Sequence, residues 1–180
     1  MSRLVYLMGA SGVGKDSLLG ALRRQHPEWL VAHRYVTRPS SASENCISLS
    51  AEEFAWRRRL GLFCLDWQAH GLDYGLGIEV RAWLERDRMV IVNGSRRALD
   101  QARERFGARL LPVLITAESA VLRERLIRRG RETLDEIEAR LARHRRLEAD
   151  LDGVERIDNS HELSHGVAAL RALLAAEHVS

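Results

Sequence analysis

The chain has 180 residues, and its hydrophobic (46%) and charged (29%) fractions are those of a globular protein large enough to bury a core. A net charge of +3 is too small to indicate nucleic-acid binding, and no apolar stretch reaches the length of a membrane span. Cys46 and Cys64 have neither the spacing of a metal site nor that of a disulfide framework, so we expect a cytoplasmic protein.

Short apolar runs alternate with amphipathic stretches, without repeats or linkers. Strands are predicted at residues 3–8, 30–36, 62–67, 88–93, 110–116 and 154–158. Helices are predicted at residues 15–25, 51–60, 77–86, 95–106, 118–129, 133–149 and 161–176. Ser50 and Glu53 have the spacing of a capping box for the second helix. The alternation predicts one α/β domain over residues 1–180, a three-layer sandwich around a mainly parallel sheet that binds ligands at its carboxyl edge.

A glycine-rich loop follows the first predicted strand and opens the first predicted helix. Lys15 within it is the only lysine among 28 basic residues. A strand, a G-x-x-x-x-G-K loop and a helix N-terminus make a phosphate-binding P-loop, whose backbone N–H groups and lysine hold phosphates. We therefore expect ATP to be bound by Gly9, Ala10, Ser11, Gly12, Val13, Gly14, Lys15, Asp16 and Ser17.

Two further segments follow predicted strands, where α/β proteins place ligand contacts. Thr37-Arg-Pro39 puts Arg38 just after a strand, with Glu44 nearby, although Arg38 also suits a solvated loop arginine. Asn93-Gly-Ser-Arg96 directly follows a buried strand.

A third segment, from Gly61 to Trp67 and on to Tyr74-Gly75, is dense in aromatic residues and glycines. This density indicates a loop that closes on a ligand, whereas Phe63 and Trp67 also suit ordinary core packing. Farther along the chain, an arginine-rich segment has glutamates at helical spacing, so most of its arginines are expected to form a solvated, paired face.

These segments, in this order, resemble the guanylate kinase superfamily, and the resemblance covers essentially the whole chain. It implies a P-loop core, an acceptor-binding region at about residues 35–80 and a lid at about residues 123–140. The catalytic residues it implies are Lys15 and the lid arginines Arg125, Arg129 and Arg140; Arg131 is a further lid arginine and Arg146 a weaker match.

Departures from the guanylate kinase pattern bear on the acceptor. This chain lacks the tyrosine of the GMP-binding region and has Asp16 after the lysine and Asn93 where an acid is usual. The combination G-K-D-S, V-T-R-P, S-x-x-E-F, A-H-G-x-x-Y-G and V-N-G-S-R is similar to the ribose 1,5-bisphosphate phosphokinases of phosphonate degradation. This similarity implies ATP-dependent conversion of ribose 1,5-bisphosphate to 5-phosphoribosyl 1-diphosphate, with no nucleic-acid or membrane partner.

The residues expected on the acceptor side are Arg38, Glu44, Asp66, Tyr74, Asn93, Ser95 and Arg96. The attacking phosphate is already an anion, so catalysis needs positioning and charge neutralisation rather than a general base. One alternative is a guanylate or other nucleoside monophosphate kinase, in which Asp66 contacts guanine. A second is a catalytically inactive interaction module, against which the intact Lys15 argues.

Mg²⁺ usually finds a hydroxyl right after the P-loop lysine and a carboxylate at a strand end. Here Asp16 follows the lysine and the amide Asn93 stands at the strand end, so we hypothesise that the two ligand types have partly exchanged places. Asp16 and Ser17 are then the metal residues, unless Asp16 serves only as an acid at the helix N-terminus.

His161-Glu-Leu-Ser-His165 matches the H-E-x-x-H pattern of zinc proteases. A third histidine at the usual metzincin spacing is absent, because position 171 is Arg171. We expect these histidines to lie on a helix surface.

Overall fold

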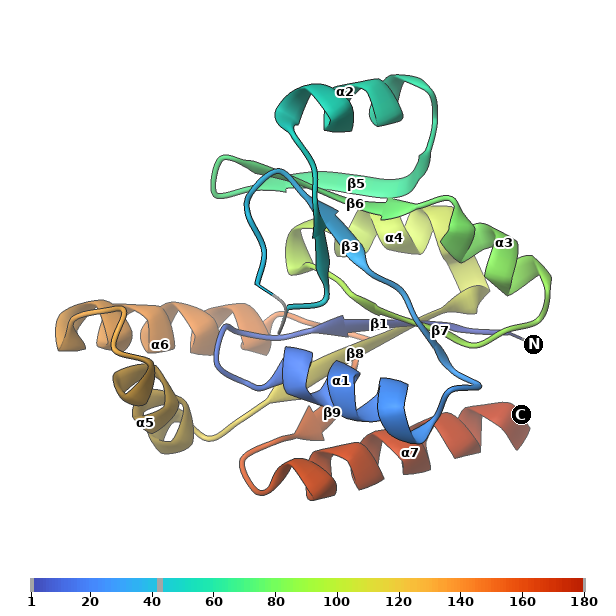
Figure 1. Cartoon of the computed structure of the whole chain (residues 1–180). Coiled ribbons are helices and arrows are strands. Elements are labelled where there is room, and N and C mark those ends of the chain that lie inside the picture. Colours follow the sequence, from blue (N-terminus) through green and yellow to red (C-terminus); the bar gives the residue numbers. More distant parts are fainter. Residues whose placement is uncertain (1, 42–43, 180) are drawn as a thin grey trace.

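The computed structural model describes residues 2–41 and 44–179. Its central sheet, sheet A, has five parallel strands in the order β2-β7-β1-β8-β9. The strands are β1 (Leu4–Met8), β2 (Leu30–Val31), β7 (Val90–Asn93), β8 (Leu110–Thr116) and β9 (Glu155–Asp158). Helices α1 (Lys15–Gln25) and α7 (Leu163–Val179) cover one face, and α3 (Glu79–Glu85) and α4 (Leu99–Phe106) lie on the other side (Figure 1). The expected α/β sandwich with a parallel sheet is confirmed.

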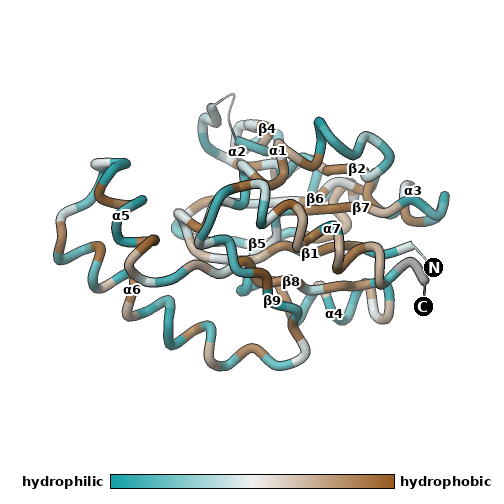
Figure 2. The backbone as a smooth tube through the Cα atoms, turned by 90° about the horizontal axis from the view of Figure 1, so that it is seen from below, coloured by the Kyte–Doolittle hydropathy of each residue, from teal (hydrophilic) through white to brown (hydrophobic). Residues whose placement is uncertain are grey.

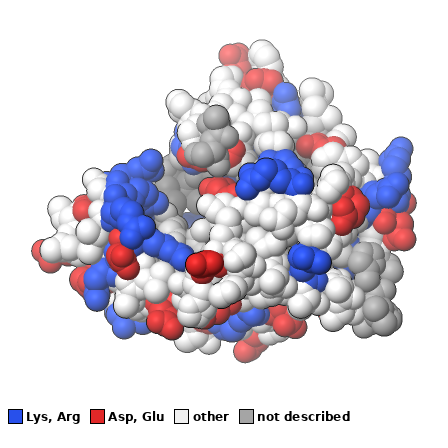
Figure 3. Space-filling model, turned by 60° about the horizontal axis from the view of Figure 1, so that its bottom comes forward, with Lys and Arg blue, Asp and Glu red and all other residues white. Residues whose placement is uncertain are grey.

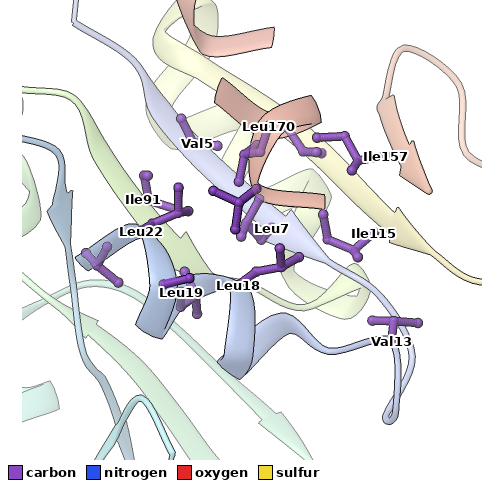
Figure 4. Close-up of a cluster of buried hydrophobic side chains, with 14 of the residues drawn as sticks. Val5, Leu7, Val13, Leu18, Leu19, Leu22, Ile91, Ile115, Ile157 and Leu170 are labelled. Carbon is purple, nitrogen blue, oxygen red and sulfur yellow. The ribbon is translucent and has the colours of Figure 1, made fainter. Parts of the chain in front are cut away.

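Alternation along β1 divides the core into two clusters, because successive side chains of a strand point to opposite faces. Val5 and Leu7 pack with Leu18 and Leu22 of α1 and with residues of α7, in the cluster drawn in Figure 4. Tyr6 belongs to the second cluster, on the other face. In Figure 2 the strands of sheet A form a hydrophobic centre within a hydrophilic periphery, so the sheet is covered on both faces as its apolar runs predicted.

A second sheet, sheet B, lies over the face of sheet A that carries Tyr6. Its order is β4-β3-β6-β5, and β6 pairs antiparallel with both of its neighbours. Its strands are β3 (Arg34–Val36), β4 (Cys46–Ser48), β5 (Phe63–Ala69) and β6 (Leu72–Gly77), with α2 (Ala51–Arg59) on the outer side in Figure 1.

Sheet B accounts for the errors in the predicted elements. The predicted strand at 30–36 is two strands, because Leu30–Val31 pairs with β7 whereas Arg34–Val36 pairs with β4 and β6. The Tyr74-Gly75 segment is part of strand β6 rather than a closing loop. Strand β4 was not predicted, since it has only three residues.

Helices α5 (Ser119–Arg129) and α6 (Leu134–Ala149) pack together and project from the carboxyl edge of sheet A as an arm (Figure 1). A capping box of Thr133 and Glu136 begins α6. Ser50 caps α2 by accepting from the Glu53 N–H at 3.0 Å. Short 3-10 turns, η1 (Arg96–Ala98) and η2 (Gly107–Arg109), flank α4. Within the described residues, no helix is both long and apolar enough to cross a membrane.

Candidate active site

The loop between β1 and α1 has the backbone of a phosphate-binding loop. Gly9, Gly12 and Gly14 have φ values of 154°, 95° and 92°. A Cβ on Gly9 would lie 2.6 Å from the Ile115 carbonyl oxygen, so glycine is required there. Gly14 is the N-cap of α1 and offers no side chain, so nothing from the cap competes for the first-turn N–H groups.

Lys15 is folded back onto this loop. Its ammonium donates to the carbonyl of Gly9 and, at 3.2 Å, to that of Ala10. Burial and then the positive charge of Arg34 lower the pKa of Lys15 to about 8, although Asp16 opposes the shift. An anion at this position would therefore relieve both desolvation and repulsion.

Asn159 and Arg125 hold the P-loop in place at the carboxyl edge of sheet A. Asn159 directly follows β9, is 4% exposed, and its Nδ2 donates to the Val13 carbonyl at 2.6 Å. Arg125 of α5 donates to the Asn159 carbonyl at 2.8 Å and to the Gly12 carbonyl at 3.3 Å. The expected lid residue Arg125 thus binds P-loop backbone directly. Asn159 was missed in the sequence, although it lies at the carboxyl end of a strand, as Asn93 does.

The arm also contacts the P-loop through its tip. Arg129 donates to Ser11 Oγ at 2.9 Å. Arg140 pairs with Glu132 at 2.6 Å, and Arg129 lies 3.5 Å from the same carboxylate. The expected residues Ser11, Arg129 and Arg140 are therefore brought together. Glu132, which sequence analysis missed, lies between the two arginines. In Figure 3 basic side chains on the left gather beside a hollow between the arm and the rest of the molecule.

The loop after β7 is fixed by Tyr6. The Tyr6 hydroxyl donates to the Ser95 carbonyl and accepts from the Ser95 N–H, both at 2.9 Å. A Cβ on Gly94 would lie 2.2 Å from the Tyr6 ring. Asn93 pairs in register with Leu7, beside the start of the P-loop, and its buried Oδ1 has no partner among the described residues. Expected residues Asn93, Ser95 and Arg96 thus border the P-loop.

Arg96 reaches the arm through His144, a second residue that sequence analysis missed. Arg96 Nη2 lies 3.1 Å from His144 Nδ1, and His144 Nε2 lies 2.6 Å from Glu148 Oε1. An arginine nitrogen can only donate, so Nδ1 accepts and the ring proton is on Nε2, facing Glu148. Burial and then the charges of Arg96 and Lys15 lower the pKa of His144 to about 4, which keeps the ring neutral.

Tyr74 lies on the side of sheet B that faces sheet A, and Arg38 comes two residues after Val36, which pairs in register with Tyr74. Arg38 pairs with Glu44 at 2.8 Å. Tyr74 stacks on Trp67 with ring centroids 5.7 Å apart, and Trp67 is part of the core cluster of Tyr6. These expected acceptor residues are therefore neighbours in space. Ala42 and Ser43, within the expected acceptor region, lie outside the described residues.

Asp66 lies on the opposite face of sheet B. Its neighbours Leu65 and Trp67 point into the core between the sheets, so Asp66 points toward α2. There it pairs with Arg58 at 2.8 Å, and Arg58 also binds Asp73 at 2.9 Å. The structure does not bring Asp66 together with the P-loop.

Asp16 and Ser17 lie in the first turn of α1 and are exposed. They line a cavity of about 560 Å³, together with Gly20, Arg23, Arg24, Glu44, Asn45 and Leu163. No group of three or more metal-ligating side chains occurs in the described part of the chain. A carboxylate, a hydroxyl and the orphaned Asn93 Oδ1 suit Mg²⁺, which binds proteins through few side chains and completes its shell with water and phosphate.

His161 precedes α7, which begins at Leu163, whereas His165 lies within it. Their rings meet edge to face at 6.0 Å, and both side chains are exposed. The two histidines therefore do not share one helical face.

Comparison with known proteins identifies the family. A relative from Pectobacterium parmentieri, named ribose 1,5-bisphosphate phosphokinase PhnN, is 48% identical over 180 residues, 97% of this chain and 94% of that protein. One of the same name from Dickeya zeae is 50% identical over 179 residues, 98% and 95% of the two chains. The chain belongs to the PhnN family. A Desulfomicrobium baculatum PhnN is 45% identical over 184 residues, 100% of this chain and 98% of that protein. No protein-family model matches the chain.

As a PhnN-family member, the chain is a kinase, which rules against an inactive interaction module. A guanylate kinase from Anaplasma phagocytophilum shares its fold, with a TM-score of 0.75 and 16% identity over 99% of this chain and 87% of that one. The PhnN fold is thus the guanylate kinase fold.

Proposed function

We propose that this enzyme transfers the γ-phosphoryl group of ATP to ribose 1,5-bisphosphate and forms 5-phosphoribosyl 1-diphosphate. The observation that carries the proposal is 45–50% identity to enzymes named for this acceptor over nearly the full length of both chains. The P-loop geometry around Lys15 supports the use of a nucleotide. The PhnN name of the relatives and the resemblance to phosphonate-degrading enzymes also support a place in phosphonate metabolism.

In the proposed step, an oxygen of the anomeric phosphate attacks the γ-phosphorus of ATP. A new P–O bond forms, the bond from the γ-phosphorus to the β–γ bridging oxygen breaks, and ADP leaves. The nucleophile is an anion at neutral pH, so the protein must position two anions and neutralise their charge. Such work suits cationic side chains rather than a general base.

Lys15 supplies this charge once its ammonium leaves the Gly9 and Ala10 carbonyls for the phosphates. Arg125 and Arg129 already bind P-loop atoms, so they are positioned to contact the phosphates of a nucleotide bound in this loop. Arg140 joins them through Glu132. We assign the lid to about residues 123–140, which lie in the projecting arm, and the acceptor-binding region to about residues 35–80, which include most of sheet B and α2.

Mg²⁺ would be held by Asp16, with Ser17 and Asn93 as neutral oxygen donors. Bound there, the ion would neutralise phosphate charge. Among residues 2–41 and 44–179, no arginine forms an ion pair that would compete for the Asp16 carboxylate. Cys46 and Cys64 are free thiols, which is compatible with the cytoplasmic location we propose.

Parallel turnover assays with ribose 1,5-bisphosphate and GMP, each with ATP and Mg²⁺, test the proposal. We expect ADP formation with the sugar bisphosphate and at most background turnover with GMP. Omission of the acceptor measures ATP hydrolysis, and EDTA should stop turnover reversibly. Efficient turnover of GMP alone would make the enzyme a guanylate kinase.

A further inference from the structure

Ion pairs neutralise several of the arginines around the candidate active site. The carboxylates of Glu44 and Glu132 pair with Arg38, Arg129 and Arg140. Arg125, which also has no carboxylate ion pair, is held by carbonyls of the P-loop and of Asn159. Across residues 2–41 and 44–179, Lys15, Arg34 and Arg96 are further cations of this site without a carboxylate ion pair. Because half-buried charges are costly without a counter-charge, these three residues mark a site for an anion.

Arg34 faces sheet A from strand β3. Side chains alternate along a strand, so Arg34 and Val36 share the face opposite to Tyr35. The Arg34 guanidinium carbon lies 4.7 Å above the ring centroid of Tyr74, the β6 residue that pairs in register with Val36. Tyr35 instead points toward α2, where Arg57 covers its ring at 5.1 Å. Arg34 therefore lies over Tyr74, between the two sheets.

The guanidinium of Arg34 has unused hydrogen-bonding capacity. Its Nε is buried without a partner among the described residues, and Nη2 contacts only Cys46 Sγ, a weak acceptor, at 3.7 Å. Arg96 likewise has a buried Nη1 without a partner, while Nη2 is held by His144. These unpaired N–H donors favour the binding of a ligand that has several oxygen atoms to accept hydrogen bonds. A phosphate group matches the fork of the guanidinium.

The charge of Arg34 acts on the P-loop. After burial, it is the largest cause that lowers the pKa of Lys15, and Arg96 acts in the same direction. The Tyr74 ring under Arg34 packs against the core cluster of Tyr6, whose hydroxyl holds Ser95, the residue before Arg96. A phosphate bound by Arg34 and Arg96 would therefore lie next to the loop that carries Lys15, where the attacking phosphate must be.

We propose that Arg34 is a substrate-binding residue that, with Arg96, holds the attacking phosphate of the acceptor and so selects an acceptor whose nucleophile is a phosphate. This inference rests on the proposed function for the identity of the acceptor. It adds Arg34 to Arg38 and Arg96 as a third basic residue on the acceptor side, and Arg34, unlike Arg38, has no carboxylate to be displaced.

Calorimetric binding of two ligands, without ATP, tests the proposal. Ribose 1,5-bisphosphate carries the attacking phosphate, and ribose 5-phosphate lacks it. For Arg34→Met we expect the dissociation constant of the bisphosphate to rise about 10- to 150-fold, the loss of one charge-assisted phosphate contact. The dissociation constants of ribose 5-phosphate and of ATP should stay within about twofold. Equal weakening of both sugars, or unchanged bisphosphate binding, would overturn the assignment.

Arg57→Met is the matched control. Arg57 also lies over a tyrosine ring of sheet B, but on the α2 face and paired with Glu53 at 2.9 Å, so acceptor binding should not change. If Arg34→Met proves unfolded by circular dichroism, Arg34→Lys keeps the charge without the planar fork and should still weaken the bisphosphate selectively. Should the wild-type enzyme use GMP instead, the same comparison of GMP with guanosine tests Arg34 independently of the proposed acceptor.

Discussion

Arg96 Nη2 lies 3.1 Å from Nδ1 of His144, which joins the loop after β7 to helix α6 of the arm. Arg96 is thereby aimed toward Lys15 by a neutral imidazole whose other nitrogen faces Glu148. A protonated His144 could not accept this hydrogen bond. The protonation state of His144 therefore affects both the stability of the protein and the position of Arg96 in the site.

His144 should make the protein less stable in mild acid. Its pKa is about 4 in the folded protein and 6.5 when unperturbed, so between these values the unfolded chain binds the extra proton. The free energy of unfolding should therefore fall by up to about 3 kcal/mol as the pH drops through this window. Glu148, whose pKa is raised by burial, opposes part of the loss.

Urea unfolding across this pH window, for wild type and His144→Asn, measures the effect. Asparagine keeps a hydrogen-bond acceptor for Arg96 but does not titrate. The free energy of unfolding of the variant should therefore depend less steeply on pH than that of the wild type. Parallel pH profiles for the two proteins would show that His144 titrates normally.

Lys15→Ala should lower turnover by at least about 100-fold while the melting temperature stays near that of the wild type. The ammonium is desolvated and held only by two carbonyls, so its loss removes little folding energy. Lys15→Arg is the control for charge alone, and we expect it to be nearly inactive because a planar guanidinium is too wide for this loop. Steady-state assays that found near-normal turnover for Lys15→Ala would refute the role of the P-loop.

Arg38→Ala should raise the KM for the acceptor about 10- to 150-fold, with little change in the KM for ATP. Arg38 must exchange Glu44 for a phosphate to make its contact, so the lower part of this range is expected. Arg58→Ala is the matched control, because Arg58 is a paired arginine on the α2 face of sheet B. An equal change in the KM values for ATP and for the acceptor in Arg38→Ala would contradict the assignment of Arg38 to the acceptor side.

A double-mutant cycle at Asp16 and Asn93 tests the metal site. Asp16→Ser should lower turnover and raise the Mg²⁺ concentration required, because an anionic ligand is lost. Asn93→Asp should add a carboxylate that repels the phosphates. If both serve one ion, the effects are non-additive and the double variant outperforms Asp16→Ser. Additive losses in Mg²⁺ titrations would leave Asp16 as an acid at the helix N-terminus.

The P-loop and sheet A were predictable because their signals are contiguous. A buried parallel strand reads as an unbroken apolar run, and the residues from Gly9 to Ser17 lie side by side in the sequence. Sheet B was less predictable. The Tyr74-Gly-Leu-Gly77 part of β6 is glycine-rich and therefore resembles a loop in the sequence. Its glycines are explained by tertiary contacts: a Cβ on Gly75 would meet the Phe63 ring, and a Cβ on Gly77 would meet the Glu79 carboxylate.

Single residues whose partners lie far away in the chain were not predictable. Asn159 contacts Val13, and His144 contacts Arg96, across separations that no local pattern records. Arg34 lies within a predicted strand, and its significance depends on its having no carboxylate ion pair within the described part of the chain, which only the fold reveals. Asp66 was expected near the acceptor, but period-two alternation in β5 turns it toward α2.

The central claim is that phosphate is the acceptor group, and ³¹P NMR of the reaction with ATP and ribose 1,5-bisphosphate tests it most directly. We predict that the signal of the anomeric phosphate monoester disappears and that two mutually coupled signals of a sugar diphosphate replace it as ADP accumulates. The 5-phosphate signal should keep the form of a monoester. A new phosphate monoester signal, or ADP with no new sugar phosphate, would contradict the account.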